Sequence, residues 1–263
     1  MDPSSRWREI VMQPEEDLPL DEAALLISAT ADSGVDVAVQ LSRLDDVAAQ
    51  IEPADTPQLC RYVFETLGVR GDRETYDDPR NSYLDQVLNR RLGIPISLSV
   101  LLMEIGRRCG VRLEGVGMPG HFLVRDPGDP GLLIDAFSGG RRLDHAACAQ
   151  LLRNVAGEEI RLQAGYLAPV GPRAILVRML ANLDHSFRRR DDREGVRRVT
   201  RLRAAIPGQP LPERIALADT LAGVGCVDEA AQLLEESARD PATPADAARG
   251  LRTRARGLLA PFN

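Results

Sequence analysis

His121 and Asp135 are the two residues whose types and spacing best suit catalysis or ligand binding. They lie in two short apolar segments, joined by residues 126–131, which are rich in proline and glycine. An antiparallel hairpin centred on that loop places His121 opposite Asp135 or Ala136. Directly opposed residues have Cβ atoms roughly 4.5–5.5 Å apart, close enough for an imidazole–carboxylate hydrogen bond. A carboxylate there would orient the imidazole, as in a nucleophile–base–orienter triad.

Other interpretations of this pair stay open. A register slip of one residue would place the two side chains on opposite faces of the hairpin. His121 can also be a structural histidine at the start of a strand. His145 and His185 lie in polar helical segments and are expected to be solvated.

The composition excludes several kinds of function. The 263-residue chain carries a formal charge of −6, so it offers no electrostatic footprint for nucleic acid or an anionic membrane. All 33 basic residues are arginines, which excludes lysine-based Schiff-base and P-loop chemistry. The four cysteines are too widely spaced for a disulfide framework or a zinc site, and we expect no metal or cofactor. Neither a secretory signal nor a transmembrane stretch is visible, so we expect a cytoplasmic protein.

A largely apolar helix is expected to position the pair. It opens near Pro95, which suits a first helical turn, and ends at Cys109, followed by Gly110 in a C′ position. Because most of its circumference is apolar, this helix should be central to the core. Ser82 is expected to cap a short preceding helix that runs to residue 92. Strands are expected over residues 113–117, 121–125 and 132–137, with the glycine pair 139–140 ending the strand region.

The rest of the chain is expected to be helical. Before the central helix we predict helices over residues 15–27, 35–51 and 57–67, and after the strands over 144–154, 174–190, 193–205, 212–224, 227–239 and 245–259. The stretch LADTLAGVGCVDEAAQLL (residues 217–234) is typical of a tetratricopeptide helix–turn–helix. Only one or two such units fit, which favours a helical cap packed on the core.

Three stretches strongly resemble SirB-type transglutaminase-like proteins. They are YDDPRNSYLDQVLNRRLGIPISLS (residues 76–99), EGVGMPGHFLVR (114–125) and IDAFSGG (134–140). The resemblance covers nearly the whole chain, since that family also ends in tetratricopeptide-like helices. Its usual D-P-F motif departs slightly here, to Asp135-Ala136-Phe137.

The resemblance implies a site built around a nucleophile at a helix start. In the wider superfamily a cysteine there attacks a carbonyl, and a His and an Asp on adjacent strands complete the triad. His121 and Asp135 match that His and Asp. Laid on the chain without gaps, the motif places Pro95 where the cysteine should be and Gly110 fifteen residues later. Ser97 is the nearest hydroxyl, and it faces His121 only if the true register is shifted.

We therefore expect an α+β protein with a papain-like, transglutaminase-like core: a central buried helix packed on a small antiparallel sheet. Helices precede this core (residues 1–165 together), and a tetratricopeptide-like helical region follows (172–263). The favoured function is non-catalytic or repurposed binding of a peptide, protein or small molecule, in a cleft around His121 and Asp135. Asn81, Pro95 and Glu114 are candidate cleft residues, and the C-terminal helices are a candidate surface for a protein partner.

The alternative is a hydrolase or acyl/amide-transfer enzyme that uses Ser97, His121 and Asp135. Two of the polar assignments also have alternatives: Asn81 can cap a turn, and Glu114 can be a rim residue. Arg125 is expected to pair with the acids of the hairpin loop.

Overall fold

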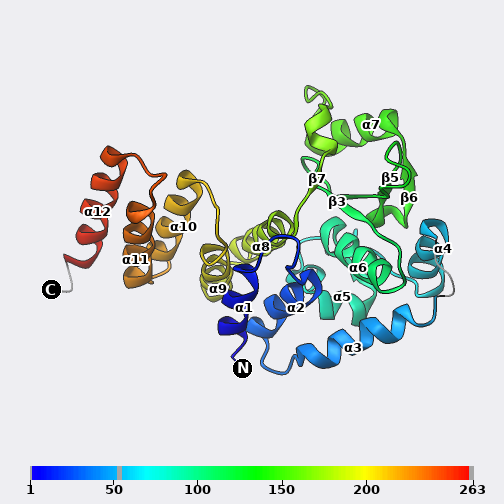
Figure 1. Cartoon of the computed structure of the whole chain (residues 1–263), viewed down its shortest axis with the longest axis horizontal. Helices are drawn as coiled ribbons and strands as arrows, with labels where there is room; N and C mark the ends of the chain where they lie inside the picture. Colours follow the sequence, from blue (N-terminus) through cyan, green and yellow to red (C-terminus); the bar gives the residue numbers. More distant parts are fainter. Residues whose placement is uncertain (1, 52–54, 261–263) are drawn as a thin grey trace.

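Helices lie on both sides of a small sheet, and the C-terminal helices extend away from it in a row (Figure 1). The computed structural model describes residues 2–51 and 55–260. Within these, no helix is long and apolar enough to cross a bilayer. The architecture is a mostly helical α+β arrangement with C-terminal helices, as expected in outline.

The main sheet is antiparallel throughout and has the strand order β6-β5-β4-β3-β7. Its strands are β3 (Glu114–Val116), β4 (Leu123–Arg125), β5 (Leu133–Asp135), β6 (Arg141–Leu143) and β7 (Pro169–Val170). The first three were predicted but are shorter than expected. The prediction that Gly139 and Gly140 end the strand region was wrong, since β6 follows them. Strands of two or three residues show too little alternation to be recognised in sequence.

Helix α6 (Pro95–Arg108) is the buried helix that the sequence predicted. Pro95 occupies its first turn, and Gly110 follows its C-cap with a φ of 80°. Residues on most of its circumference are buried, and it contacts β3, β4 and the 3₁₀ turn η3 (Ala136–Ser138). The preceding helix α5 (Leu84–Arg90) begins after Tyr83, so the predicted Ser82 cap was wrong. Ser82 instead ends a 3₁₀ turn, η2 (Pro79–Asn81).

The N-terminal helices are α1 (Pro3–Val11), α2 (Leu20–Ala31), α3 (Val37–Ala48) and α4 (Thr56–Arg61), with a π-helical turn over Tyr62–Thr66. Helix α1 was not predicted, although Asp2 caps it and Pro3 opens it. Its Trp7 is buried and donates from its indole nitrogen to the Leu202 carbonyl at 3.0 Å. This contact joins helix α1 to helix α9 (Arg193–Ala204).

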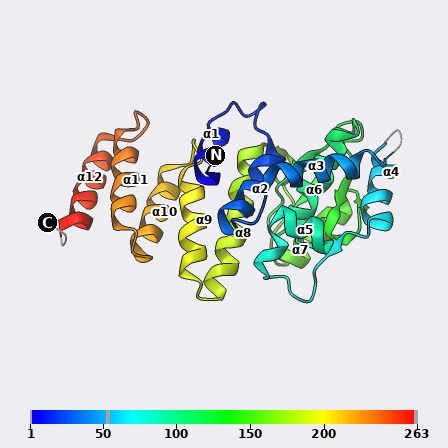
Figure 2. The same cartoon turned by 90° about the horizontal axis from the view of Figure 1, so that it is seen from below.

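The C-terminal helices lie side by side (Figure 2). They are α8 (Pro172–Arg189), α9 (Arg193–Ala204), α10 (Leu211–Gly223), α11 (Val227–Arg239) and α12 (Ala245–Leu259), each within two residues of its predicted ends. Helix α7 (His145–Ala156) starts after an Asp144 cap and covers the sheet. A parallel pair, β1 (Arg70–Gly71) with β2 (Leu92–Gly93), was not predicted.

Apolar side chains form separate clusters. The largest joins α1, α2, α6, α8 and α9, whereas Leu217, Leu221, Leu234 and Leu251 belong to a cluster confined to α10–α12 and the residues beside them. A third lies between the sheet and α7. Helices α8 and α9 therefore share the core of the sheet-bearing part. The division into residues 1–165 and 172–263 stays a prediction.

Candidate ligand site around His121 and Asp135

His121 and Asp135 meet at the open ends of two neighbouring strands. His121 lies two residues before β4, after a turn in which its amide donates to the Met118 carbonyl at 3.1 Å, and Asp135 ends β5. His121 Nε2 is 2.8 Å from Asp135 Oδ1, and both side chains are buried.

The hairpin register differs from the predicted one. Val124 pairs with Ile134 and Arg125 with Leu133, so Asp135 is not directly opposite His121. Extending this register places Phe137 there instead. The contact forms diagonally, because His121 has already left the ladder and a diagonal neighbour is still within reach of a long side chain. The spatial pairing of His121 with Asp135 is present, but direct opposition was wrong.

Asp135 is held as a carboxylate. Its Oδ1 also accepts hydrogen bonds from the amides of Phe137 (3.1 Å) and Ser138 (3.3 Å), at the start of η3. Burial alone would raise the pKa of Asp135, but the hydrogen bond and charge of His121 and the Ser138 bonds leave the pKa lowered. An ionised carboxylate only accepts, so His121 Nε2 carries the proton and donates. In neutral His121, Nδ1 is then an acceptor, and no residue in the described part of the chain hydrogen-bonds to it.

Aromatic rings flank the imidazole. The Phe137 ring stands edge-on to His121, with 6.2 Å between the ring centroids, and Tyr76 meets Phe137 edge-on at 5.9 Å. The guanidinium of Arg73 lies over the Phe137 ring, 4.9 Å from its centroid. Phe137 also lines a hollow of about 500 Å³, together with Ser138 and residues of the 70–74 segment. A ligand in this hollow would thus contact Phe137, whose ring stands edge-on to His121.

Ser97 is not brought to His121. Its side chain is fully buried one turn into α6, where Oγ accepts from the Ile94 amide at 3.1 Å and donates to the Asn81 carbonyl at 2.5 Å. No hydrogen bond joins Ser97 to His121 in the part of the chain that the structure describes. Pro95 is also buried, at the first position of the helix.

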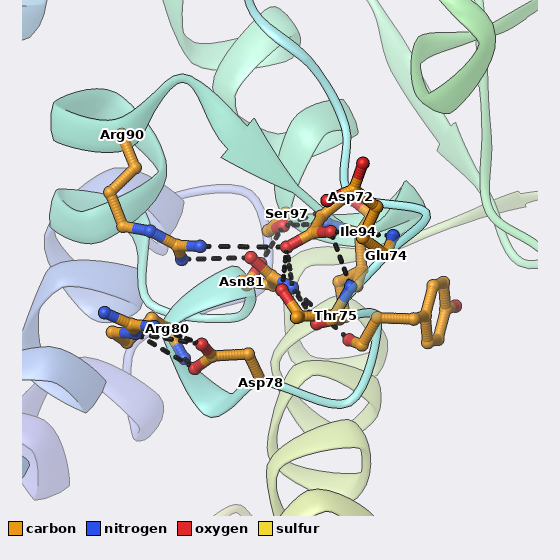
Figure 3. A network of polar contacts seen from close by, with 10 residues as sticks. Asp72, Glu74, Thr75, Asp78, Arg80, Asn81, Arg90, Ile94 and Ser97 are labelled. Carbon is orange, nitrogen blue, oxygen red and sulfur yellow. Dashed lines mark hydrogen bonds and ion pairs between the residues drawn. The ribbon is translucent and has the colours of Figure 1, made fainter.

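Asn81 anchors a loop rather than lining an open site (Figure 3). Its side chain is fully buried. Nδ2 donates to Asp72 Oδ2 (3.0 Å) and to the Thr75 carbonyl (2.7 Å), while Oδ1 accepts from Arg90 (3.0 Å). These bonds tie residues 72–81, including Tyr76, to α5. The turn-forming alternative for Asn81 is what the contacts show.

Asp72 is the charged centre of this network. Burial would raise the pKa of Asp72, but hydrogen bonds from the hydroxyl and amide of Thr75, from Asn81 and from the Glu74 amide lower it to about 2. Arg90 Nη2 lies 3.7 Å from the same carboxylate. The loop that carries Tyr76 is therefore held by an ionised, nearly inaccessible aspartate.

Glu114 lies away from His121. It faces Arg125 across β3 and β4, and Arg125 Nη2 donates to it at 2.6 Å, so the predicted pairing of Arg125 with the hairpin acids was wrong. Those acids have other partners: Asp126 accepts from Thr56 and Asp129 pairs with Arg142. Glu114 lines a different cavity, of about 890 Å³, next to the end of α6.

Comparison with known proteins assigns the chain to a family. The transglutaminase-like superfamily profile matches residues 36–181, more than half of the chain. The chain belongs to the transglutaminase-like superfamily. It is 40% identical over 219 residues to a UPF0162 protein of Xylella fastidiosa, covering 78% of each chain. It is 36% identical over 191 residues to a UPF0162 protein of Pseudomonas aeruginosa, covering 70% of this chain and 69% of the relative.

A further similarity reaches mammals. Human F-box only protein 21 is 37% identical over 130 residues, which cover 46% of this chain and 20% of the human protein. No solved structure matches the chain. The superfamily match extends through β7 into α8, so the start of the C-terminal helices belongs to the matched region.

Some residues at the site were not predicted. Tyr76 and Phe137 lie within the stretches that carry the family resemblance, so their place in those stretches was an available signal. Arg178 had none. It lies on α8, yet its Nη2 donates to the carbonyls of Met118 (2.9 Å) and His121 (2.7 Å) and so holds the turn that presents the imidazole.

Proposed function

We propose that this transglutaminase-like superfamily member is a non-catalytic, SirB-type binding protein with a papain-like core. Its ligand, a peptide, protein or small molecule, binds around His121 and Asp135. The proposal rests mainly on Ser97. Its hydroxyl is buried and hydrogen-bonded to two main-chain groups, the Ile94 amide and the Asn81 carbonyl. Proline stands at the helix start, where the superfamily resemblance calls for a cysteine.

Serine catalysis demands a contact that is missing here. A serine hydroxyl is a weak nucleophile unless a base takes its proton, and that base must lie within hydrogen-bond reach. Two of the four thiols are also poor replacements for the serine. Burial raises the pKa of both Cys60 and Cys148 to about 11, which keeps them protonated at neutral pH.

The His121 site retains what binding requires. An orienting carboxylate fixes the imidazole, whose Nδ1 is an acceptor in the neutral form. Phe137, which stands edge-on to this ring, lines a hollow of about 500 Å³. The similarity to a short part of a larger human protein supports the core as a module that works in different contexts. We infer that the C-terminal helices offer a separate surface for a protein partner, that no cofactor, nucleic acid or membrane is involved, and that the protein is cytoplasmic.

Catalysis is tested with ester and amide probes. We expect no turnover of p-nitrophenyl acetate or a fluorogenic peptide amide above the buffer rate, for the wild type and for Ser97→Ala alike. Ser42→Ala, at an exposed position, is the matched control. Turnover that disappears in Ser97→Ala and His121→Ala but persists in Ser42→Ala would refute the non-catalytic proposal and establish the hydrolase alternative.

Binding is tested by a thermal-shift screen of peptides and metabolites. We expect a ligand whose affinity falls in His121→Ala and is unchanged in His185→Ala, which removes an exposed histidine from α8. Ligands that bind both variants equally would place binding elsewhere. Dependence on α10–α12 alone would make those helices the functional surface.

A further inference from the structure

Arg178 lies next to the turn that carries His121 and has no carboxylate partner among the described residues. Its Nη2 is used by the carbonyls of Met118 and His121, and its guanidinium lies 5.5 Å from the centroid of the Phe122 ring. Nε and Nη1 donate to no group in the described residues. Two donor nitrogens of a positively charged side chain therefore remain available.

The other arginines on α8 differ from Arg178 in their partners. Arg173 pairs with Glu15, Arg188 with Asp184 and Arg189 with Asp77. Those three arginines have carboxylate partners. The partners of Arg178 are the main-chain carbonyls of Met118 and His121 and the ring of Phe122. Burial of the guanidinium lowers the pKa of Arg178, and the structure shows no acidic side chain beside it to offset that penalty.

Gly117 and Tyr76 lie close to Arg178. A Cβ placed at Gly117 would lie 3.4 Å from the Val170 side chain and 3.5 Å from Arg178 Nη1. Tyr76, close enough for the positive charge of Arg178 to act on its phenol, is 46% exposed. Arg73, stacked on Phe137, also pairs with no carboxylate in the described residues. Arg73 and Tyr76 therefore lie against Phe137, which stands edge-on to the imidazole, and Arg178 holds the turn that carries His121.

We propose that Arg178 binds a carboxylate of a peptide ligand. The carboxylate neutralises the guanidinium charge that the protein leaves unpaired, while Tyr76 and Phe137 pack against the adjoining side chain of the peptide. The proposal rests on the proposed function and names the ligand chemistry of that site. Guanidinium–carboxylate hydrogen bonds are short and about twice as strong as neutral ones. The carboxylate comes either from the peptide C-terminus or from an acidic side chain.

Peptide pools and the three histidines of the chain provide the test. Three random hexapeptide pools serve as probes: one with free C-termini and no acidic residues, one C-terminally amidated and free of acidic residues, and one amidated with a single glutamate. Imidazole NMR signals of His121 report binding at the site. We expect the free pool, the glutamate pool or both to shift them at concentrations roughly tenfold below the neutral amidated pool. Which pool binds identifies the source of the carboxylate.

Two variants connect this effect to Arg178. Arg178→Gln should abolish the preference for carboxylate, and Arg190→Gln, an exposed arginine that follows α8, should keep it. Because Arg178→Gln also removes bonds to the Met118–His121 turn, Gly117→Asp gives an independent answer. It places an internal carboxylate beside an intact Arg178 and should weaken carboxylate binding roughly tenfold, whereas Gly117→Asn should not.

The outcomes separate the two proposals. Equal shifts of His121 by all three pools overturn the carboxylate proposal and leave ligand binding at His121 in place. A carboxylate preference that survives in both Arg178→Gln and Gly117→Asp also overturns it. If no pool perturbs His121, the carboxylate proposal fails and the peptide-binding form of the proposed function fails with it.

Discussion

Asp72 should make the stability of the core depend on pH in a way that one substitution removes. The folded state holds its pKa at about 2, against 3.8 for a free aspartate. A lowered folded pKa means that the unfolded chain takes up a proton first on acidification. The stabilisation from Asp72 is therefore complete above about pH 4 and is lost as the pH falls through the folded pKa, near 2.

The size of the effect follows from the shift. Each unit of pKa is worth about 1.4 kcal/mol, so the difference between 3.8 and about 2 corresponds to about 2 kcal/mol. Asp72→Asn cannot titrate and also loses charge-assisted bonds from Thr75 and Asn81. We expect it to be about 2–4 kcal/mol less stable than the wild type at pH 6. That gap should shrink by about 2 kcal/mol at pH 2.

Urea unfolding at several pH values between 6 and 2 measures the gap. The fluorescence of Trp7, the single tryptophan, reports on the main core in which it is buried. Asp46→Asn, at an exposed position, is the matched control and should track the wild type throughout. A wild-type to Asp72→Asn gap that stays constant across this range would refute the assignment of an ionised, network-bound Asp72.

Three further substitutions probe the site and the core. Asp135→Asn should lower the free energy of unfolding by about 2–4 kcal/mol, because His121 and two amides lose a charged acceptor; a loss below about 0.5 kcal/mol would contradict a buried carboxylate there. Gly140→Ala should lower the free energy of unfolding by more than about 2 kcal/mol, since the φ of Gly140 is 76° and a Cβ there would lie 2.6 Å from the Phe64 ring. Gly139→Ala should lower it by about 1 kcal/mol, because φ is 72° there but the space around a Cβ is open. Equal losses in thermal or urea unfolding would argue against that close packing. Leu234→Ala should increase amide hydrogen exchange in α10–α12 and leave α6 protected, because its cluster is separate from the main core; faster exchange in both would show one cooperative unit.

The sequence by itself determined α6, the C-terminal helices and the identity of the central pair. Periodic apolar residues with clear breakers predict the C-terminal helices to within two residues. Pro95 and Gly110 bound α6 because a fixed φ suits a helix start and a positive φ suits its end. His121 and Asp135 were found because each lies in a short apolar segment beside a turn. These signals are local, so they can be recognised without knowing what packs against them.

Tertiary structure decided everything that depends on partners distant in sequence. The register of β4 against β5 depends on where the hairpin loop closes, and the observed register does not place Asp135 directly opposite His121. Ser97 was a plausible nucleophile from its distance to Pro95, but packing turned its hydroxyl toward the Asn81 carbonyl. Arg178 carried no sequence signal, because its role comes from α8 lying against the His121 turn. Side-chain direction and unpaired charge are properties of the assembled core, which is why the pair was predictable and its surroundings were not.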